Sequence, residues 1–136
     1  MLQPRSAARR AALASALALA FAAPAPGWSQ AAGLDGRRFE GVFLERGKTS
    51  GDADTIIFSN GRFRSTACDR YGYSDAPYTV TQLADGLAFE AETHSPRYGR
   101  LVWKGIVRGD KLDATATMVR EGKPPVENWV VAGAKK

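Results

Sequence analysis

The stretch that most constrains the fold is DTIIFSNGRFR, residues Asp54–Arg64. Two runs rich in β-branched and aromatic residues flank Asn60-Gly61, and both turn residues tolerate the positive φ angles of a type I′ turn. Ile56 and Phe58 are two positions apart, so they share one face of the first strand. A lone hairpin is only marginally stable in water. We therefore expect further strands to cover this apolar face.

The chain after residue 31 is divided by turn residues into short β-rich runs at intervals of about ten residues, and it shows no helical period. The expected strands are Arg38–Glu45, Asp54–Ser59, Arg62–Thr66, Tyr78–Leu83, Leu87–His94, Arg100–Arg108, Lys111–Arg120 and Val126–Val131. Short connections favour antiparallel neighbours. The pattern predicts an all-β fold, a single eight-stranded antiparallel up-and-down barrel, with a β-sandwich as the alternative.

Alternation of residue type predicts which face of each strand is buried. Leu87 and Phe89 share the apolar face of their strand. The opposite face carries Glu90, Glu92 and His94, which we expect to lie in solvent.

Two tryptophans are predicted to lie in the core, because Trp103 and Trp129 each sit in mid-strand among aliphatic residues. Several small residues share the predicted inner faces: Ala91, Gly105, Ala114 and Ala116. They either leave an internal cavity or offset the volume of Trp103 and the phenylalanines in a filled interior.

Residues 1–31 have the features of a secretory signal peptide. Arg5, Arg9 and Arg10 precede a mainly apolar run over residues 11–23, and Ser29-Gln30-Ala31 places small residues at a cleavage site. The apolar run is too short to span a bilayer as a helix. We expect a mature domain of residues 32–136 that is periplasmic or secreted and has no membrane span.

The full chain has 19 Lys and Arg residues, 14 Asp and Glu residues and a formal net charge of +5. Three of the arginines belong to the signal sequence, which leaves 16 basic and 14 acidic residues. Charges of both signs are interspersed, and this balance does not favour nucleic acid or a membrane surface as a partner. A mature chain of about 105 residues suffices for one core.

The strand order, the size and the export signal resemble the small lipocalin-like and avidin-like (calycin-type) β-barrels of bacterial envelopes. The resemblance covers Phe39 to Gly133 and is one of strand pattern, since Phe39-Glu40-Gly41 stands where lipocalins have Gly-x-Trp. It implies a barrel and, for function, a non-enzymatic protein that holds a small apolar or amphipathic ligand at the barrel mouth. It transfers no functional residues to this chain.

The segment Ala67–Tyr78 is the main candidate for contact with a ligand or a partner. It is long for a barrel connection, no helix is expected in it, and it mixes phenols with charges. The candidate contact residues are Asp69, Arg70, Tyr71, Tyr73 and Tyr78. The tyrosines could equally plug one end of the barrel. An alternative function is a periplasmic interaction module, an inhibitor or accessory subunit, that contacts an envelope protein through this segment.

Cys68 is the single cysteine, so the chain can form no internal disulfide. We interpret Cys68 as a small buried residue, and the alternatives are an intermolecular disulfide, a reactive thiol paired with His94, or a soft metal or haem ligand. His94 is the single histidine. These two residues offer no interpretable catalytic pair, so an enzyme is the least favoured class. We expect no catalytic residue, metal or cofactor.

Overall fold

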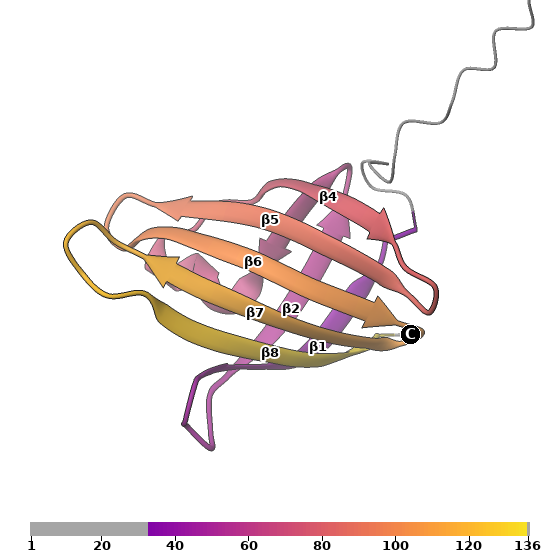
Figure 1. Cartoon of the computed structure of the whole chain (residues 1–136), viewed down its shortest axis with the longest axis horizontal. Coiled ribbons are helices and arrows are strands. Elements are labelled where there is room, and N and C mark those ends of the chain that lie inside the picture. Colours follow the sequence, from indigo (N-terminus) through magenta and orange to yellow (C-terminus); the bar gives the residue numbers. More distant parts are fainter. Residues whose placement is uncertain (1–32, 136) are drawn as a thin grey trace, which may run out of the picture.

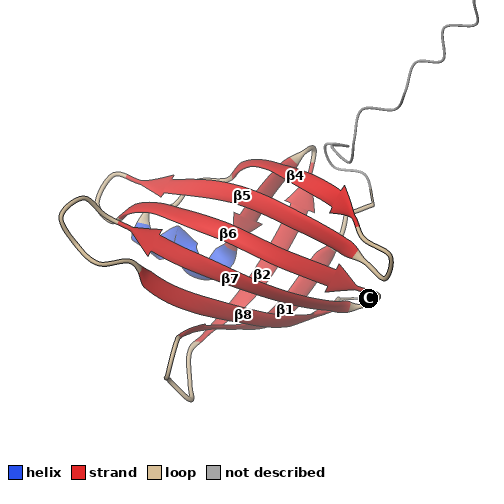
Figure 2. Ribbon diagram, in the orientation of Figure 1, coloured by secondary structure: helices blue, strands red, loops and turns tan. Residues whose placement is uncertain are grey.

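The computed structural model describes residues 33–135, and the predicted signal sequence lies outside this range. The elements are β1 (Arg38–Glu45), β2 (Asp52–Ser59), β3 (Arg62–Ser65), the 3₁₀ helix η1 (Thr66–Tyr71), β4 (Ala76–Gln82), β5 (Leu87–Ser95), β6 (Gly99–Arg108), β7 (Lys111–Val119) and β8 (Val126–Ala134). All neighbouring strands are antiparallel, and β1 pairs with both β2 and β8 (Figures 1 and 2). The predicted closed up-and-down barrel is confirmed, and the sandwich alternative is wrong.

The predicted hairpin joins β2 to β3. Asn60 and Gly61 have φ angles of 52° and 73°, and Phe58 pairs with Phe63 across the two strands. The other strands begin and end within a few residues of their predicted bounds. None of the helices in residues 33–135 has the length and hydrophobicity needed to cross a bilayer.

The expectation of no helix after β3 is wrong, because Thr66–Tyr71 form η1. The backbone N–H of Ala67 donates to Oδ1 of Asp54 on β2 at 3.0 Å, which satisfies one of the free donors of the first turn. Gly72, with φ 81°, ends the helix, and its N–H donates to the carbonyl of Asp69 at 3.0 Å. The capping carboxylate comes from another strand, so the local sequence does not reveal it.

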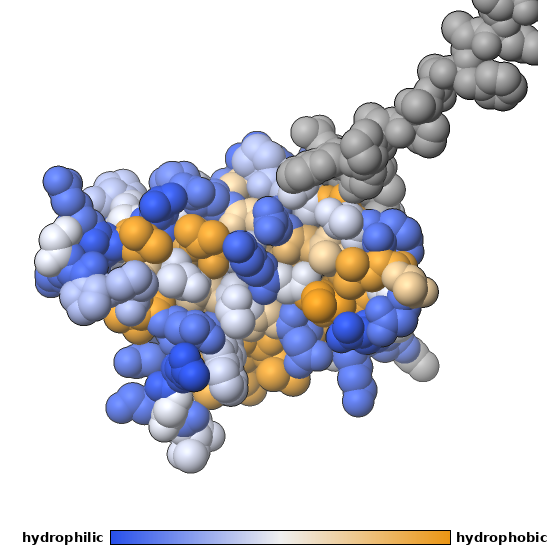
Figure 3. Space-filling model, in the orientation of Figure 1, coloured by the Kyte–Doolittle hydropathy of each residue, from blue (hydrophilic) through white to orange (hydrophobic). Residues whose placement is uncertain are grey.

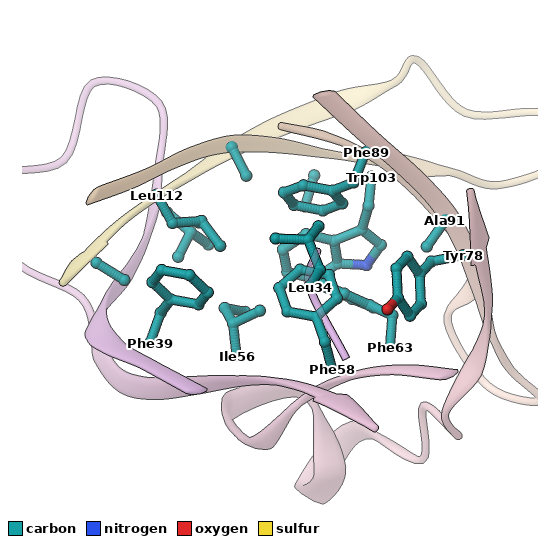
Figure 4. Close-up of a cluster of buried hydrophobic side chains, with 14 of the residues drawn as sticks. Leu34, Phe39, Ile56, Phe58, Phe63, Tyr78, Phe89, Ala91, Trp103 and Leu112 are labelled. Atoms are coloured by element: carbon teal, nitrogen blue, oxygen red, sulfur yellow. The ribbon is translucent and has the colours of Figure 1, made fainter. Parts of the chain in front are cut away.

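Aromatic side chains fill the middle of the barrel (Figure 4). The ring centroids of Phe63 and Trp103 are 4.7 Å apart, and those of Phe58 and Phe89 are 5.1 Å apart. A Cβ at Gly105 would lie only 2.4 Å from the Phe89 ring. The small residue at position 105 therefore makes room for the Phe89 ring in the barrel interior.

Of the two tryptophans predicted to be buried, Trp103 faces the inside of the barrel and Trp129 faces the outside. Trp103 is fully buried, as predicted, but the prediction for Trp129 is wrong, since it is 42% exposed. Asn128 and Val130 face the interior, and strand alternation then places Trp129 outside, where its Nε1–H donates to Glu127 Oε1 at 2.7 Å. The predicted solvent face of β5 is exposed at all three positions: Glu90, Glu92 and His94.

The two ends of the barrel differ. Residues 33–36 close one end, the base: Leu34 is fully buried among the core rings (Figure 4). Asp35 accepts hydrogen bonds there from the Gly61 N–H (3.0 Å) and the Tyr78 hydroxyl (2.6 Å). The other end, the mouth, carries the β1–β2 loop (46–51), η1, the β5–β6 turn (96–98) and the β7–β8 turn (120–125).

Candidate functional site at the barrel mouth

A pocket of about 580 Å³ opens at the mouth. This volume lies within the range of small-molecule sites in proteins. The apolar part of its wall comes from the mouth-side ends of three strands: Phe43 on β1, Leu101 on β6 and Met118 on β7. Phe43 also lies against Trp103, at 6.0 Å between ring centroids, and so joins the pocket to the filled core. The pocket is thus the unfilled end of the barrel interior.

Polar groups lie around the apolar wall. Asn128 is 6% exposed, and its side-chain N–H donates to the carbonyl of Ala116 at 3.1 Å. Asp52 and Lys48 line the pocket from the β1–β2 side of the mouth. An occupant would therefore meet apolar groups inside and charged groups near solvent.

The structure brings only two of the five predicted contact residues to the pocket, Tyr71 and Tyr73. Tyr78 lies on β4 and is directed to the base, where its hydroxyl binds Asp35. Burial and this hydrogen bond raise the pKa of Tyr78. Tyr78 is therefore part of the structural closure of the base.

The two charged candidates lie on η1 and take part in ion pairs. Asp69 pairs with Arg64 of β3, and Arg70 pairs with Asp52 at the start of β2. These pairs tie the short helix to the barrel wall. Neither residue lines the mouth pocket.

Tyr98 is a pocket residue that the sequence reasoning missed. Its ring centroid is 5.6 Å from that of Tyr71, which is 40% exposed. The Tyr73 hydroxyl donates to the Tyr98 carbonyl at 3.4 Å. Tyr98 could have been predicted from the strand order. In an up-and-down barrel, the connection after β5 lies at the same end as the connection between β3 and β4, which contains most of the Ala67–Tyr78 segment.

A buried polar cluster lies where η1 meets the barrel wall. Asp54 is 3% exposed, and burial raises the pKa of its carboxyl, while hydrogen bonds from Ala67 and Ser65 act in the opposite direction. The Ser65 hydroxyl donates to Asp54 Oδ2 at 2.7 Å, and its Oγ lies 3.3 Å from Cys68 Sγ. The cluster fixes η1, and with it Cys68, at the edge of the pocket.

Cys68 and His94 lie in different environments. Cys68 is 4% exposed, and burial, with nearby carboxylates, raises the pKa of its thiol to about 12. His94 projects from the outer face of β5, where its Nε2 lies 3.5 Å from Glu92 Oε1. Within residues 33–135 no cluster of three or more His, Cys, Asp or Glu side chains could hold a metal ion.

The raised pKa of Cys68 predicts slow alkylation. We expect the rate of reaction of the folded, reduced protein with iodoacetamide to increase up to pH 9 without a plateau, because the thiolate is the reacting species. In urea the same thiol should react faster and titrate near about pH 8.5. A plateau below about pH 7 in the folded protein would contradict this assignment and favour a reactive thiol.

A second hollow, of about 460 Å³, lies on the outer surface over β5–β8. Trp129, Val131 and Ile106 contribute its apolar surface, and Figure 3 shows hydrophobic residues between charged ones on this face. Val131 is 59% exposed. Nothing in the described part of the chain covers this surface.

The chain matches no protein-family model, no curated protein and no solved structure.

Proposed function

We propose that the protein is an exported, non-enzymatic binding protein of lipocalin-like type that holds a small apolar or amphipathic ligand in the mouth pocket. One observation carries this proposal: the base is sealed and the middle is filled, while the mouth keeps a pocket of about 580 Å³. Protein interiors are normally close-packed, and an apolar hollow of this size is typical of a ligand-binding site.

The pocket wall supports a ligand with an apolar body. Met118 has a flexible, polarizable side chain that adapts to different shapes, and Tyr73 and Tyr98 offer flat apolar surfaces with polar tips. Charged groups such as Lys48 stand near solvent. The ligand would thus insert its apolar part and keep any polar end at the rim.

Two further observations support export and a non-enzymatic role. The signal-like residues 1–31 end just before the segment that closes the base. The Cys68 thiol is protonated at neutral pH because burial raises its pKa to about 12, and His94 faces away from the pocket. A catalytic pair would require a thiol with a lowered pKa and a histidine within hydrogen-bond distance of it.

Filling the pocket tests the proposal. The uncharged fluorophore N-phenyl-1-naphthylamine should bind the wild-type protein with enhanced emission, and Met118→Trp should weaken this binding by about tenfold or more because indole occupies the hollow. Fluorescence titration measures both affinities. Val131→Trp, which fills the outer hollow instead, is the matched control and should leave the affinity within about twofold.

Either of two results would refute a ligand site at the mouth. The first is no saturable binding of the fluorophore or of any lipid extracted with the exported protein. The second is loss of binding in Val131→Trp with retention in Met118→Trp. Circular dichroism of both variants would show that each is folded.

A second candidate function is the interaction module, and exposed Tyr71 is the observation that favours it. Its ring contacts Tyr98, and the Arg70 guanidinium lies 5.1 Å from its centroid, a combination common in protein interfaces. A photoreactive amino acid at position 71 would test this in cells. Protein-sized adducts that form in the envelope would support the module, and their absence would leave the ligand-binding function as the better proposal.

A further inference from the structure

A groove of about 600 Å³ lies on the outer side of the mouth, where the β5–β6 turn meets the end of β7. Arg97, Arg100, Arg120 and His94 line it, and among the described residues Glu121 is the one acidic member of its wall. Hydrophilic residues gather at this end of the molecule, the left end in Figure 3. The groove is separate from the mouth pocket, to which β6 and β7 contribute the inward-facing Leu101 and Met118.

The local backbone holds two of these arginines together. Gly99 has φ 82°, and a Cβ there would lie 2.7 Å from the Val119 carbonyl oxygen and 3.1 Å from Cγ of Arg120. Glycine thus lets the β5–β6 turn lie directly against the end of β7. Arg97 in this turn is thereby brought to the groove that Arg120 lines.

The turn that carries Arg97 is itself fixed by hydrogen bonds. Ser95 Oγ accepts from the N–H groups of Arg97 (3.3 Å) and Tyr98 (3.2 Å), and it donates to the Tyr71 carbonyl (2.6 Å). The Arg97 guanidinium lies 5.4 Å from the Tyr98 ring centroid. Stacking on an aromatic face leaves the N–H edge of a guanidinium free to bind an anion.

The charges in the groove are poorly neutralised by the protein. Every arginine within residues 33–135 forms an ion pair with a carboxylate except Arg38, Arg97 and Arg120, so two of these three line the groove. Arg100 has Glu92 at 3.5 Å, and His94 shares the same carboxylate at the same distance. Arg97 and Arg120 thus line one groove without an ion-pair partner among residues 33–135, and such an excess of positive charge favours a bound anion.

We propose that this groove is a binding site for a phosphate group. Arginine forks match the oxygens of phosphate with paired N–H donors, and guanidinium groups that converge from two elements can contact several oxygens of one tetrahedral anion. A soluble phosphorylated compound and a phospholipid headgroup share this chemistry. The lining of the groove shares no residue with that of the mouth pocket, so the two hollows are distinct sites.

The test is a titration of the mature protein with inorganic phosphate at constant ionic strength, followed by ¹H–¹⁵N NMR. Saturable shifts are expected at the backbone amides of Arg97, Gly99 and Arg120. The double variant Arg97→Gln, Arg120→Gln should weaken binding by about tenfold or more. Arg38→Gln removes the third unpaired arginine, which lies at the start of β1 near the base, and should change the affinity by less than about twofold.

Vesicles distinguish the source of the phosphate. Sedimentation with phosphatidylcholine vesicles, with and without phosphatidylglycerol, would identify a lipid headgroup if binding requires the anionic lipid, Arg97 and Arg120. Phosphate binding without vesicle binding would identify a soluble compound. The proposal is overturned if both probes fail to bind, or if Arg38→Gln weakens binding as much as the double variant does.

Discussion

Trp103→Ala is expected to lower the free energy of unfolding by about 3–5 kcal/mol. The Trp103 side chain is fully buried and packs on Phe63 and Phe43 at the centre of the barrel. Its Nε1–H donates to Thr93 Oγ1 at 3.2 Å, and truncation would leave this buried hydroxyl without its donor as well as creating a cavity. Urea unfolding with a shared m-value gives the difference in stability.

Two variants serve as controls for this prediction. Trp129→Ala removes the same side chain from the outer surface, where it is 42% exposed, and should cost less than about 1 kcal/mol. Glu92→Ala on the solvent face of β5 should change stability by at most about 0.5 kcal/mol. Equal losses for Trp103→Ala and Trp129→Ala would show that the inner and outer faces are wrongly assigned.

Gly41→Ala is expected to destabilise the closure of the barrel by about 3 kcal/mol or more. A Cβ at Gly41 would lie 2.0 Å from the carbonyl oxygen of Val131 and 2.6 Å from the Cα of Ala132. These are backbone atoms of β8, the strand that pairs with β1 to close the sheet. They can move away only if β1 and β8 separate, which breaks ladder hydrogen bonds along the seam.

Gly133→Ala is the matched control on the same seam. A Cβ at Gly133 would meet only the Asp110 carbonyl oxygen at 3.9 Å, an ordinary contact. We expect a change within about 0.5 kcal/mol, because no backbone atom must move. Thermal unfolding of both variants decides the matter: equal melting temperatures would show that the β1–β8 seam tolerates a side chain at Gly41.

Much of the barrel was predictable because its signals are local. The Asn60-Gly61 turn and the two-residue alternation of strands such as Leu87–Ser95 depend on neighbours in the chain. They specified the number of strands, their order and the buried position of Trp103. The prediction that Trp129 is buried was wrong because hydrophobicity alone does not show which of two adjacent strand residues faces inward. Asn128 and Val130 face the interior, so Trp129 between them faces outward.

The candidate site was predictable only in part. The Ala67–Tyr78 segment does reach the mouth, and Tyr71 and Tyr73 line the pocket. Tyr78 was assigned to the same site from proximity in sequence, yet the direction of β4 carries it toward the base. Tyr73 and Tyr78 are close in sequence, but β4 begins between them and leads the chain from the mouth to the base.

The sequence by itself determined the strand pattern, the hairpin turn and the alternation of faces, because these follow from backbone geometry over a few residues. Only the tertiary structure decided which barrel end is sealed and where the interior stays hollow. Those outcomes depend on contacts between distant segments: Leu34 against the core, the Asp54 carboxylate at the start of η1, and the turn of Gly99 against Arg120. Such contacts exist only after the sheet has closed, and closure brings together groups that no local pattern relates.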